Sequence, residues 1–166
     1  MIMIRRFFRH LWSGYWQAPR LFPKTSRARL AEAIRSAETG HAGEICFVIE
    51  ASLTPHQLWR RLSAHERALD LFSDLRLWDT EQNSGLLIYL LLADHAVEIV
   101  ADRGLMHAEI GQAWPDLLRD LRQALTAGEF EAGCLAAIGR AGQVLRQHFP
   151  AIGPDTNELP DRVPLL

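Results

Sequence analysis

The sequence lacks most of the features that mark a secreted, membrane-spanning or zinc-binding protein. It holds two cysteines among 166 residues, Cys46 and Cys134, which are too few for a disulfide framework or a four-cysteine zinc site. Its longest apolar run, Leu86 to Ala93, is far shorter than the about 20 residues of a membrane-spanning helix. Three arginines interrupt the first apolar residues, so we expect no signal peptide. These absences favour a cytoplasmic protein and leave open a peripheral position at the inner membrane.

Familiar catalytic signatures are absent as well. The chain has no Walker phosphate loop and no GxGxxG dinucleotide signature. It has no GxSxG nucleophile elbow, and neither HExxH nor CxxC for zinc. Neither cysteine lies in a cationic setting that would activate a thiolate, and we expect both to be buried free thiols. The sequence therefore assigns no catalytic residue.

Acidic residues are missing from the first 29 positions, which hold seven Arg or Lys residues. Since the net charge of the whole chain is −2, the remaining residues carry −9. Residues 1–16 predict a basic amphipathic helix, which is typical of contact with a membrane surface or an acidic partner. The alternative is that its aromatic face packs on the domain's own sheet. Nucleic acid is not expected, because the acidic remainder would repel phosphate. The residues expected to contact a membrane or partner are Arg5, Arg6, Phe8, Arg9, Trp12 and Trp16.

Apolar periodicity and capping residues predict the other elements. Ala18 to Lys24 is expected to be a linker and Ala151 to Leu166 an extended tail. Strands are expected at Glu44–Glu50, Gly85–Leu92 and Ala96–Val100, the last two joined by a tight turn. Helices are expected from Thr25 or Ser26 to Gly40, from Pro55 through Phe72 with Leu69 on its core face, from Trp114 to Leu125, and from Glu129 to Phe149.

Carboxylates gather near the ends of the predicted strands. Asp102 follows the last strand, and the carboxyl ends of strands in α/β sheets are where sites tend to form. Asp79 and Glu81 lie in the polar loop before the central strand. Carboxylate oxygens suit Ca²⁺ or Mg²⁺, which polarise phosphoryl oxygens and activate water. These three residues are therefore candidate metal ligands. The alternatives are a turn-forming aspartate at Asp102 and solvated loop acids at the other two.

A series of segments carries a resemblance to a known family. In order they are EICFVIE, ALDLFSDL, LWDTEQNSGLLIYLLLADHAVEIVADRGL, AGEFEAG and HFP. The pattern resembles the TPM domain family, often labelled TPM phosphatase, in its short bacterial form. Asn83 and Gly85 stand at the NxG position before one strand, and Asp102 and Gly104 at the (D/G)xG position after the next. The resemblance runs from about Ala28 to Pro150.

The resemblance implies an α/β fold: a three-layer α/β/α sandwich with a mixed, mainly parallel sheet flanked by helices. It divides the chain into a basic aromatic helix and linker at 1–24, a TPM-like domain at 25–150 and an extended tail at 151–166. Some family members are phosphatases and some bind Ca²⁺, and bacterial members are associated with LemA-type membrane proteins. Where longer members have glycine after the second strand, this chain has Asp102-Arg103, which departs from the family pattern.

Three hypotheses about function follow. The first is a binding or accessory module of the TPM fold that binds a cation or partner and supports an envelope-associated process. The second is a divalent-metal-assisted phosphatase that uses Asp102 and the loop acids. The third is a structural globular domain without a small-molecule site.

Overall fold

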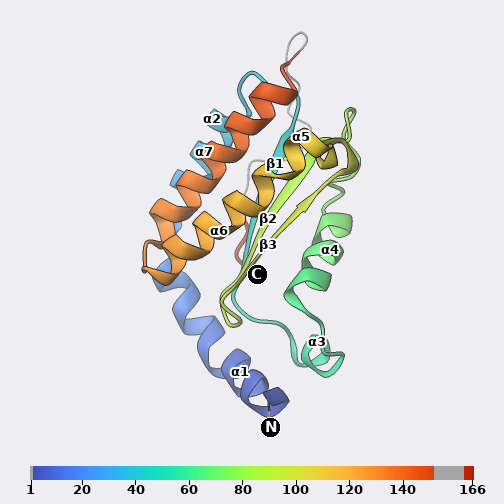
Figure 1. Cartoon of the computed structure of the whole chain (residues 1–166). Coiled ribbons are helices and arrows are strands. Elements are labelled where there is room, and N and C mark those ends of the chain that lie inside the picture. Colours follow the sequence, from blue (N-terminus) through green and yellow to red (C-terminus); the bar gives the residue numbers. More distant parts are fainter. Residues whose placement is uncertain (1, 152–162) are drawn as a thin grey trace.

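The structure is a computed structural model that describes residues 2–151 and 163–166; the side chains of 2–4, 12–16, 108 and 109 lie outside the description. It is a three-layer α/β/α sandwich, which confirms the expected fold class (Figure 1). The sheet has the order β1-β2-β3, with β1 (Glu44–Glu50), β2 (Gly85–Leu91) and β3 (Ala96–Ala101). One face is covered by α2 (Lys24–Glu38), α6 (Ala113–Thr126) and α7 (Phe130–His148), and the other by α4 (Ala64–Asp74).

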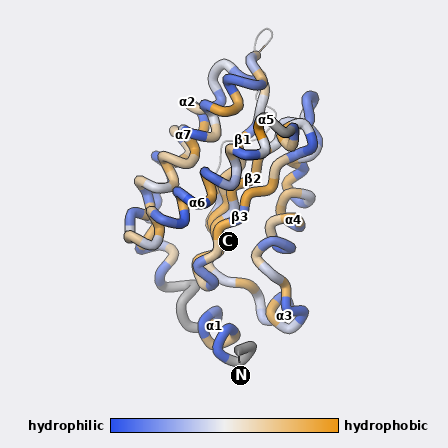
Figure 2. The backbone as a smooth tube through the Cα atoms, in the orientation of Figure 1, coloured by the Kyte–Doolittle hydropathy of each residue, from blue (hydrophilic) through white to orange (hydrophobic). Residues whose placement is uncertain are grey.

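The central strand β2 is buried along its whole length, as its continuous apolar run predicts. It pairs in parallel with β1 and antiparallel with β3, so the sheet is mixed. Figure 2 shows that the strands form the most hydrophobic part of the chain. Alternate side chains of the strands enter two cores, one under α2, α6 and α7 and one under α4.

The end of the chain extends the sheet beside β1. Ile49 N–H donates to the Pro164 carbonyl (3.1 Å), and Leu166 N–H donates to the Ile49 carbonyl (2.9 Å). The short pairing of Leu165 with Ile49 is parallel. The described part of the predicted tail is therefore an extended segment along the outer edge of β1, whereas Asn157 to Asp161 lies outside the described residues.

The first helix is longer than the sequence predicts. Helix α1 (Ile2–Leu21) continues through Pro19 and most of the expected linker, which leaves only two residues before α2. Tertiary packing explains the difference, because Ala18 and Phe22 are buried in the core and the Phe22 ring meets Phe130 edge-on at 6.1 Å. That burial outweighs the cost of a proline in the last turns of the helix.

The predicted helix from Pro55 through Phe72 is two helices, α3 (Pro55–Trp59) and α4. Arg61 adopts a left-handed conformation (φ 57°) between them. Ser63 then caps α4, since its side chain accepts from the Glu66 N–H and Glu66 bonds back to the Ser63 N–H. The break changes which residues face the core: Ala68 is buried, and Leu69 is 46% exposed.

Two short elements connect β3 to α6. These are a 3-10 helix, η1 (Arg103–Met106), and α5 (Ala108–Gly111). They follow Asp102 directly, so they fix how the predicted site residue meets the rest of the sheet. None of the helices in the described part of the chain is long and apolar enough to cross a membrane.

Candidate functional site

Asp102 lies at the end of β3, next to the beginning of β2. Its Oδ1 accepts from the Arg103 N–H (2.7 Å), which caps η1. Arg103 Nε donates to Asn83 Oδ1 (2.9 Å), and the Gly104 N–H donates to the Asn83 carbonyl (3.0 Å). A Cβ at position 104 would lie 2.5 Å from that carbonyl oxygen, which explains the glycine. The two motif positions of the resemblance therefore meet in space.

The same geometry gives one observation for a bound cation and one against it. Asp102 Oδ2 is buried and has no hydrogen-bond partner among the described residues. A carboxylate oxygen in this state favours a cation. However, the guanidinium of Arg103 already bonds the amide oxygen of Asn83, and its positive charge opposes a divalent ion there.

The other two candidate ligands do not join Asp102 in a metal site. Asp79 and Glu81 are exposed in the turns before β2. Within residues whose side chains are described, no group of three or more His, Cys, Asp or Glu residues is placed to hold a metal ion. Proteins bind Ca²⁺ through roughly six to eight oxygen ligands, so Asp79, Glu81 and Asp102 fit this ion poorly. A metal role for the three residues stays a prediction.

The position of Asp102 in the sheet also differs from the usual α/β arrangement. Because β3 runs antiparallel to β2, Asp102 lies beside the beginning of β2, at Gly85. The carboxyl ends of the parallel strands β1 and β2 lie at the opposite end of the sheet. The carboxylates at that end of the sheet are Glu50, at the end of β1, and Asp94, in the turn after β2.

Asp94 is held by three basic side chains of α1. Arg6 donates to its Oδ2 from Nε (3.0 Å) and Nη2 (2.7 Å), Arg9 donates to its Oδ1, and His10 Nε2 lies 3.0 Å from Oδ1. Burial alone would raise the pKa of Asp94, but the hydrogen bonds from His10, Arg6 and Arg9 outweigh it and hold this pKa well below its usual range. The carboxylate is therefore charged and fixes α1 to the hairpin of β2 and β3.

His10 completes this attachment from a fully enclosed position. Its Nδ1 accepts a hydrogen bond from the Leu53 N–H (3.0 Å), so the proton of the neutral ring is on Nε2, which faces Asp94. Arg6 Nη2 also donates to the Leu62 carbonyl (2.8 Å). The helix is thus bonded to both segments that flank α3, the one before it and the one after it.

Glu50 belongs to a second, separate network. Arg67 Nε donates to its Oε2 (3.0 Å), and the buried Tyr89 hydroxyl donates to the same oxygen (2.5 Å). Burial and the negative charge of Glu50 raise the pKa of Tyr89, so the phenol keeps its proton. Every oxygen of this network has a partner, and its role is to join α4 to β1 and β2.

The two cysteines are free thiols; Cys134 is buried as expected, whereas Cys46 is half-buried. Burial raises the pKa of Cys46 and of Cys134 to about 12. Neither residue is a thiolate near neutral pH, which fits the absence of a cysteine nucleophile in the sequence.

The attachment to Asp94 turns apolar side chains of α1 toward solvent. Phe8 is 61% exposed and Leu11 is 63% exposed, whereas His10 is buried. A helix on a globular protein normally shows the reverse, with its apolar side inward and its basic side outward. Trp59 at the end of α3 is 85% exposed, and Phe7 is also exposed. Phe7 and Leu11 line, with Leu53 and Leu58, a shallow groove of about 170 Å³ where α1 meets α3.

Exposed basic residues occur on α1 and directly after α3. Arg5, Arg60 and Arg61 are exposed. No acidic residue occurs before Glu32, and none occurs from 51 to 65. We call the set Arg5, Phe7, Phe8, Leu11, Trp59, Arg60 and Arg61 the α1–α3 surface; both of its helices lie at the end of the molecule that holds the N-terminus (Figure 1).

Membrane or partner contact by the six residues that the sequence selects stays a prediction, and the structure shows where some of their side chains lie. Arg5 and Phe8 are exposed, whereas Arg6 and Arg9 bond to Asp94 within the molecule. The side chains of Trp12 and Trp16 lie outside the described residues. The contributions of Trp59, Arg60 and Arg61 were missed, although an acid-free stretch containing Trp-Arg-Arg is a usable signal.

Comparisons with known proteins agree with the fold described above. The model of the TPM domain matches residues 17–144. The NMR structure of the BA42 protein from Bizionia argentinensis superposes with a TM-score of 0.74 and 26% identity, covering 85% of this chain and 92% of that one. The N-terminal domain of a protein from P. gingivalis gives 0.60 and 18%, covering 80% and 83%. No curated protein matches. The first 16 residues, which carry most of the α1–α3 surface, precede the family match.

Proposed function

The chain belongs to the TPM domain family, and we propose that it is a binding module of that fold which attaches to an anionic membrane surface through the α1–α3 surface. In this role it is an accessory protein of a process at the cell envelope and not primarily an enzyme. The observation that carries the proposal is the reversed orientation of α1, which turns Arg6, Arg9 and His10 toward Asp94 and Phe8 and Leu11 toward solvent.

The chemistry of the surface matches a lipid interface. Aromatic and aliphatic side chains enter the region between headgroups and acyl chains, and cations beside them pair with anionic headgroups. Each Arg near an anionic membrane contributes about 1 kcal/mol. Arg5, Arg60 and Arg61 together therefore contribute about 3 kcal/mol, or roughly a 100-fold gain in partitioning.

Co-sedimentation with lipid vesicles tests the proposal. We expect the protein to bind vesicles that contain phosphatidylserine, to bind pure phosphatidylcholine weakly, and to dissociate as salt is raised. The variant Phe8→Ser/Leu11→Ser/Trp59→Ser should lose binding to both. The matched control is Met106→Ser, which removes an exposed apolar side chain outside the α1–α3 surface.

Two outcomes would change the conclusion. Equal binding by the triple variant and the control would remove the α1–α3 surface from the proposal. Binding only to vesicles that carry a membrane protein of the LemA type would assign the surface to that protein partner instead of to lipid.

A second candidate function, cation binding at Asp102, rests on the buried and unpaired Oδ2. A ligand that binds only the native state raises the melting temperature. We expect Ca²⁺ or Mg²⁺ to raise the melting temperature of the wild type slightly, and of Arg103→Gln more, because that substitution removes the competing charge from Asn83. Asp102→Asn should abolish both shifts. A metal-assisted phosphatase is the hydrolytic form of this candidate, and hydrolysis of a phosphate monoester that Asp102→Asn leaves unchanged would contradict it.

A further inference from the structure

Strand β3 is an edge strand with unpaired backbone groups. In an antiparallel pair, successive residues point their N–H and C=O alternately toward and away from the partner strand. The Asp102 N–H donates to the Gly85 carbonyl, so the residues two and four positions earlier also face β2. Val97, Ile99 and Ala101 therefore face outward.

Only one of these outward residues has a partner in the part of the chain that the structure describes. Arg122 Nη2 donates to the Val97 carbonyl (2.9 Å). No described residue bonds the outward N–H and C=O groups of Ile99 and Ala101. A row of such groups is a template for an additional strand.

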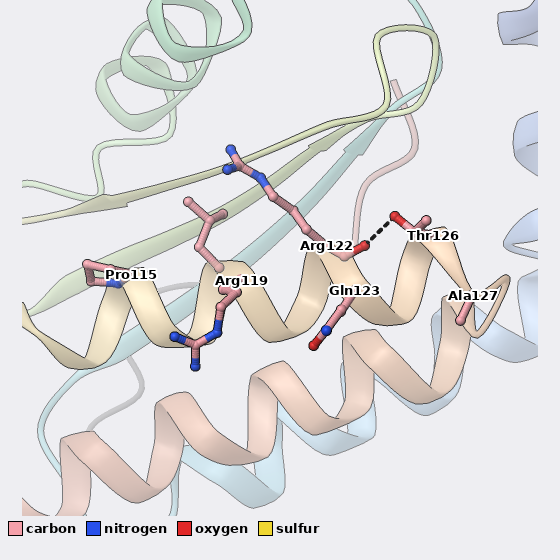
Figure 3. A pocket seen from close by; sticks show the side chains of 7 residues that line it. Pro115, Arg119, Arg122, Gln123, Thr126 and Ala127 are labelled. Carbon is pink, nitrogen blue, oxygen red and sulfur yellow. Dashed lines mark hydrogen bonds between the residues drawn. The ribbon is translucent and has the colours of Figure 1, made fainter.

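The open edge lies between two helices that both pack on β3, namely α6 on one face and α4 on the other. On one side of the edge α6 forms a wall, because its Arg122 bonds to Val97, and the same helix carries a shallow groove of about 680 Å³ that α6 residues line. Figure 3 shows Arg122 reaching from α6 toward the strands, with Pro115 and Thr126 on the same helix. Leu118 supplies an apolar side chain to this wall.

Helix α4 forms the opposite wall. His65 on α4 lies 3.3 Å from Glu98 of β3, which identifies the side of α4 nearest to β3. Leu69 is one turn further along the same side, and it is 46% exposed. The sequence places Leu69 in the core, but the break before α4 turns it outward. An exposed leucine beside an unpaired strand edge is what a bound strand would cover.

We propose that the outer edge of β3 binds an extended peptide segment of a partner protein as a fourth strand. Backbone groups of the segment would pair with Ile99 and Ala101, and its side chains would lie alternately against Leu69 on α4 and Leu118 on α6. Arg122 forms an ion pair with Glu98 (3.7 Å) and donates to the Val97 carbonyl, but about half of its side chain is exposed, so its guanidinium can pair with a second carboxylate. The segment is therefore one with apolar residues and an acidic residue opposite Arg122.

A second copy of this chain does not fit the same edge. Pairing β3 with β3 of another copy would place the strands about 4.8 Å apart. The helices on β3 would then approach to a similar separation, although packed helices need about 8–10 Å. A lone extended segment brings no helix with it, so it avoids this clash.

Selection from a displayed library of random peptides of about nine residues, the length of a long strand, tests the proposal. We expect selected peptides to contain Asp or Glu among apolar residues and to bind the wild type. Ile99→Pro should weaken their binding about tenfold or more, because proline removes an outward N–H without removing a bond to β2. Leu69→Glu and Arg122→Gln should each weaken it, and the matched control Met106→Ser should not.

Amide hydrogen exchange keeps the proposal falsifiable if a variant fails to fold. In the free protein the amides of Ile99 and Ala101 should exchange much faster than those of Glu98 and Val100, and a selected peptide should slow them. Slow exchange at Ile99 and Ala101 in the free protein would overturn the proposal. A library that yields no peptide sensitive to Ile99→Pro or Leu69→Glu would overturn it as well.

Discussion

At the scale of single residues, one carboxylate decides how the N-terminal helix is held. Asp94 receives bonds from Arg6, Arg9 and His10, and it sits in the turn between β2 and β3. Without it the partly buried Arg6 and the buried His10 would lose the carboxylate that they contact. The outward position of Phe8 and Leu11 therefore depends on Asp94.

Replacing Asp94 with alanine should lower the free energy of unfolding by about 3 kcal/mol, because it removes the carboxylate that the partly buried Arg6 and the buried His10 contact. The pKa of Asp94 is lowered in the folded state. Its contribution is therefore fully present above about pH 4, near the usual pKa of aspartate, and declines as the pH falls further. Urea unfolding of wild type and Asp94→Ala at several pH values measures this difference. A difference that stays constant below about pH 4 would contradict the assignment.

The Glu50 network makes a separate prediction. Tyr89→Phe removes the buried hydroxyl that donates to Glu50 and keeps the ring in place, so it should cost about 1–2 kcal/mol. The variant to compare with Tyr89→Phe is Arg67→Met. Among the described residues Arg67 is the cation that bonds to Glu50, so this variant should cost more, about 3 kcal/mol. Equal stabilities of Tyr89→Phe and wild type in urea would show that the hydrogen bond contributes nothing.

Sequence reasoning at this scale identified residue types better than their partners. It selected Asp102 and assigned Asn83 and Asp102 to two separate motif positions, and the structure adds that these positions meet through Arg103 and Gly104. It could not find that Asp94 pairs with α1, because residues 85 positions apart meet only once the sheet has formed. The available signal was an acidic residue in a predicted turn, Asp94, together with an N-terminal helix that has basic residues and no acidic residue.

At the scale of elements, capping explains where the second helical region divides. The sequence contains Ser63 followed by Glu66, a capping box, in the middle of a stretch whose apolar spacing predicts one helix. Ser63→Ala should destabilise the protein by about 1 kcal/mol through the lost cap. The matched control is Ser73→Ala, at an exposed position within α4, which should change stability by less than about 0.5 kcal/mol. Thermal unfolding of both variants measures this, and equal effects would contradict the capping assignment.

The beginning of β2 requires a residue without a side chain. A Cβ at Gly85 would lie 1.9 Å from the Leu77 carbonyl oxygen. Gly85→Ala should therefore destabilise the protein by several kcal/mol, roughly the upper end of what overpacking costs, or prevent folding. Gly139 in α7 has open space around its Cα. Gly139→Ala should therefore stabilise by about 0.5–1 kcal/mol. Circular dichroism melts compare the two, and a tolerated Gly85→Ala would contradict the packing described.

The elements that the sequence predicted well are those with a strong local pattern. The apolar run of β2 and the alternation around Ile99 identify a hairpin without tertiary information. The end of α1 was missed because Pro19 and Pro23 read as a linker, whereas burial of Ala18 and Phe22 keeps the helix going. Local patterns cannot report such burial, since it depends on Phe130 in a distant helix.

At the scale of the whole molecule, basic residues are concentrated in the first part of the chain, and the α1–α3 surface lies at one end of the structure. The basic first 29 residues form α1 and the start of α2, and the apolar and basic α1–α3 surface lies at one end. Deleting residues 1–20 would remove Ala18 from the core, so loss of binding in that truncation would be ambiguous. Substitution of exposed residues is the cleaner test.

The measurement that tests the central proposal most directly is NMR of the protein on anionic vesicles that carry nitroxide-labelled lipid. A nitroxide broadens the signals of nuclei close to it, so it reports which part of the protein touches the membrane. The proposal predicts broadening of the backbone amides of residues 5–11 and 58–61, with α7 unaffected and Arg60→Glu/Arg61→Glu restoring the signals. Broadening spread evenly over the molecule, or centred on α7, would contradict attachment through the α1–α3 surface.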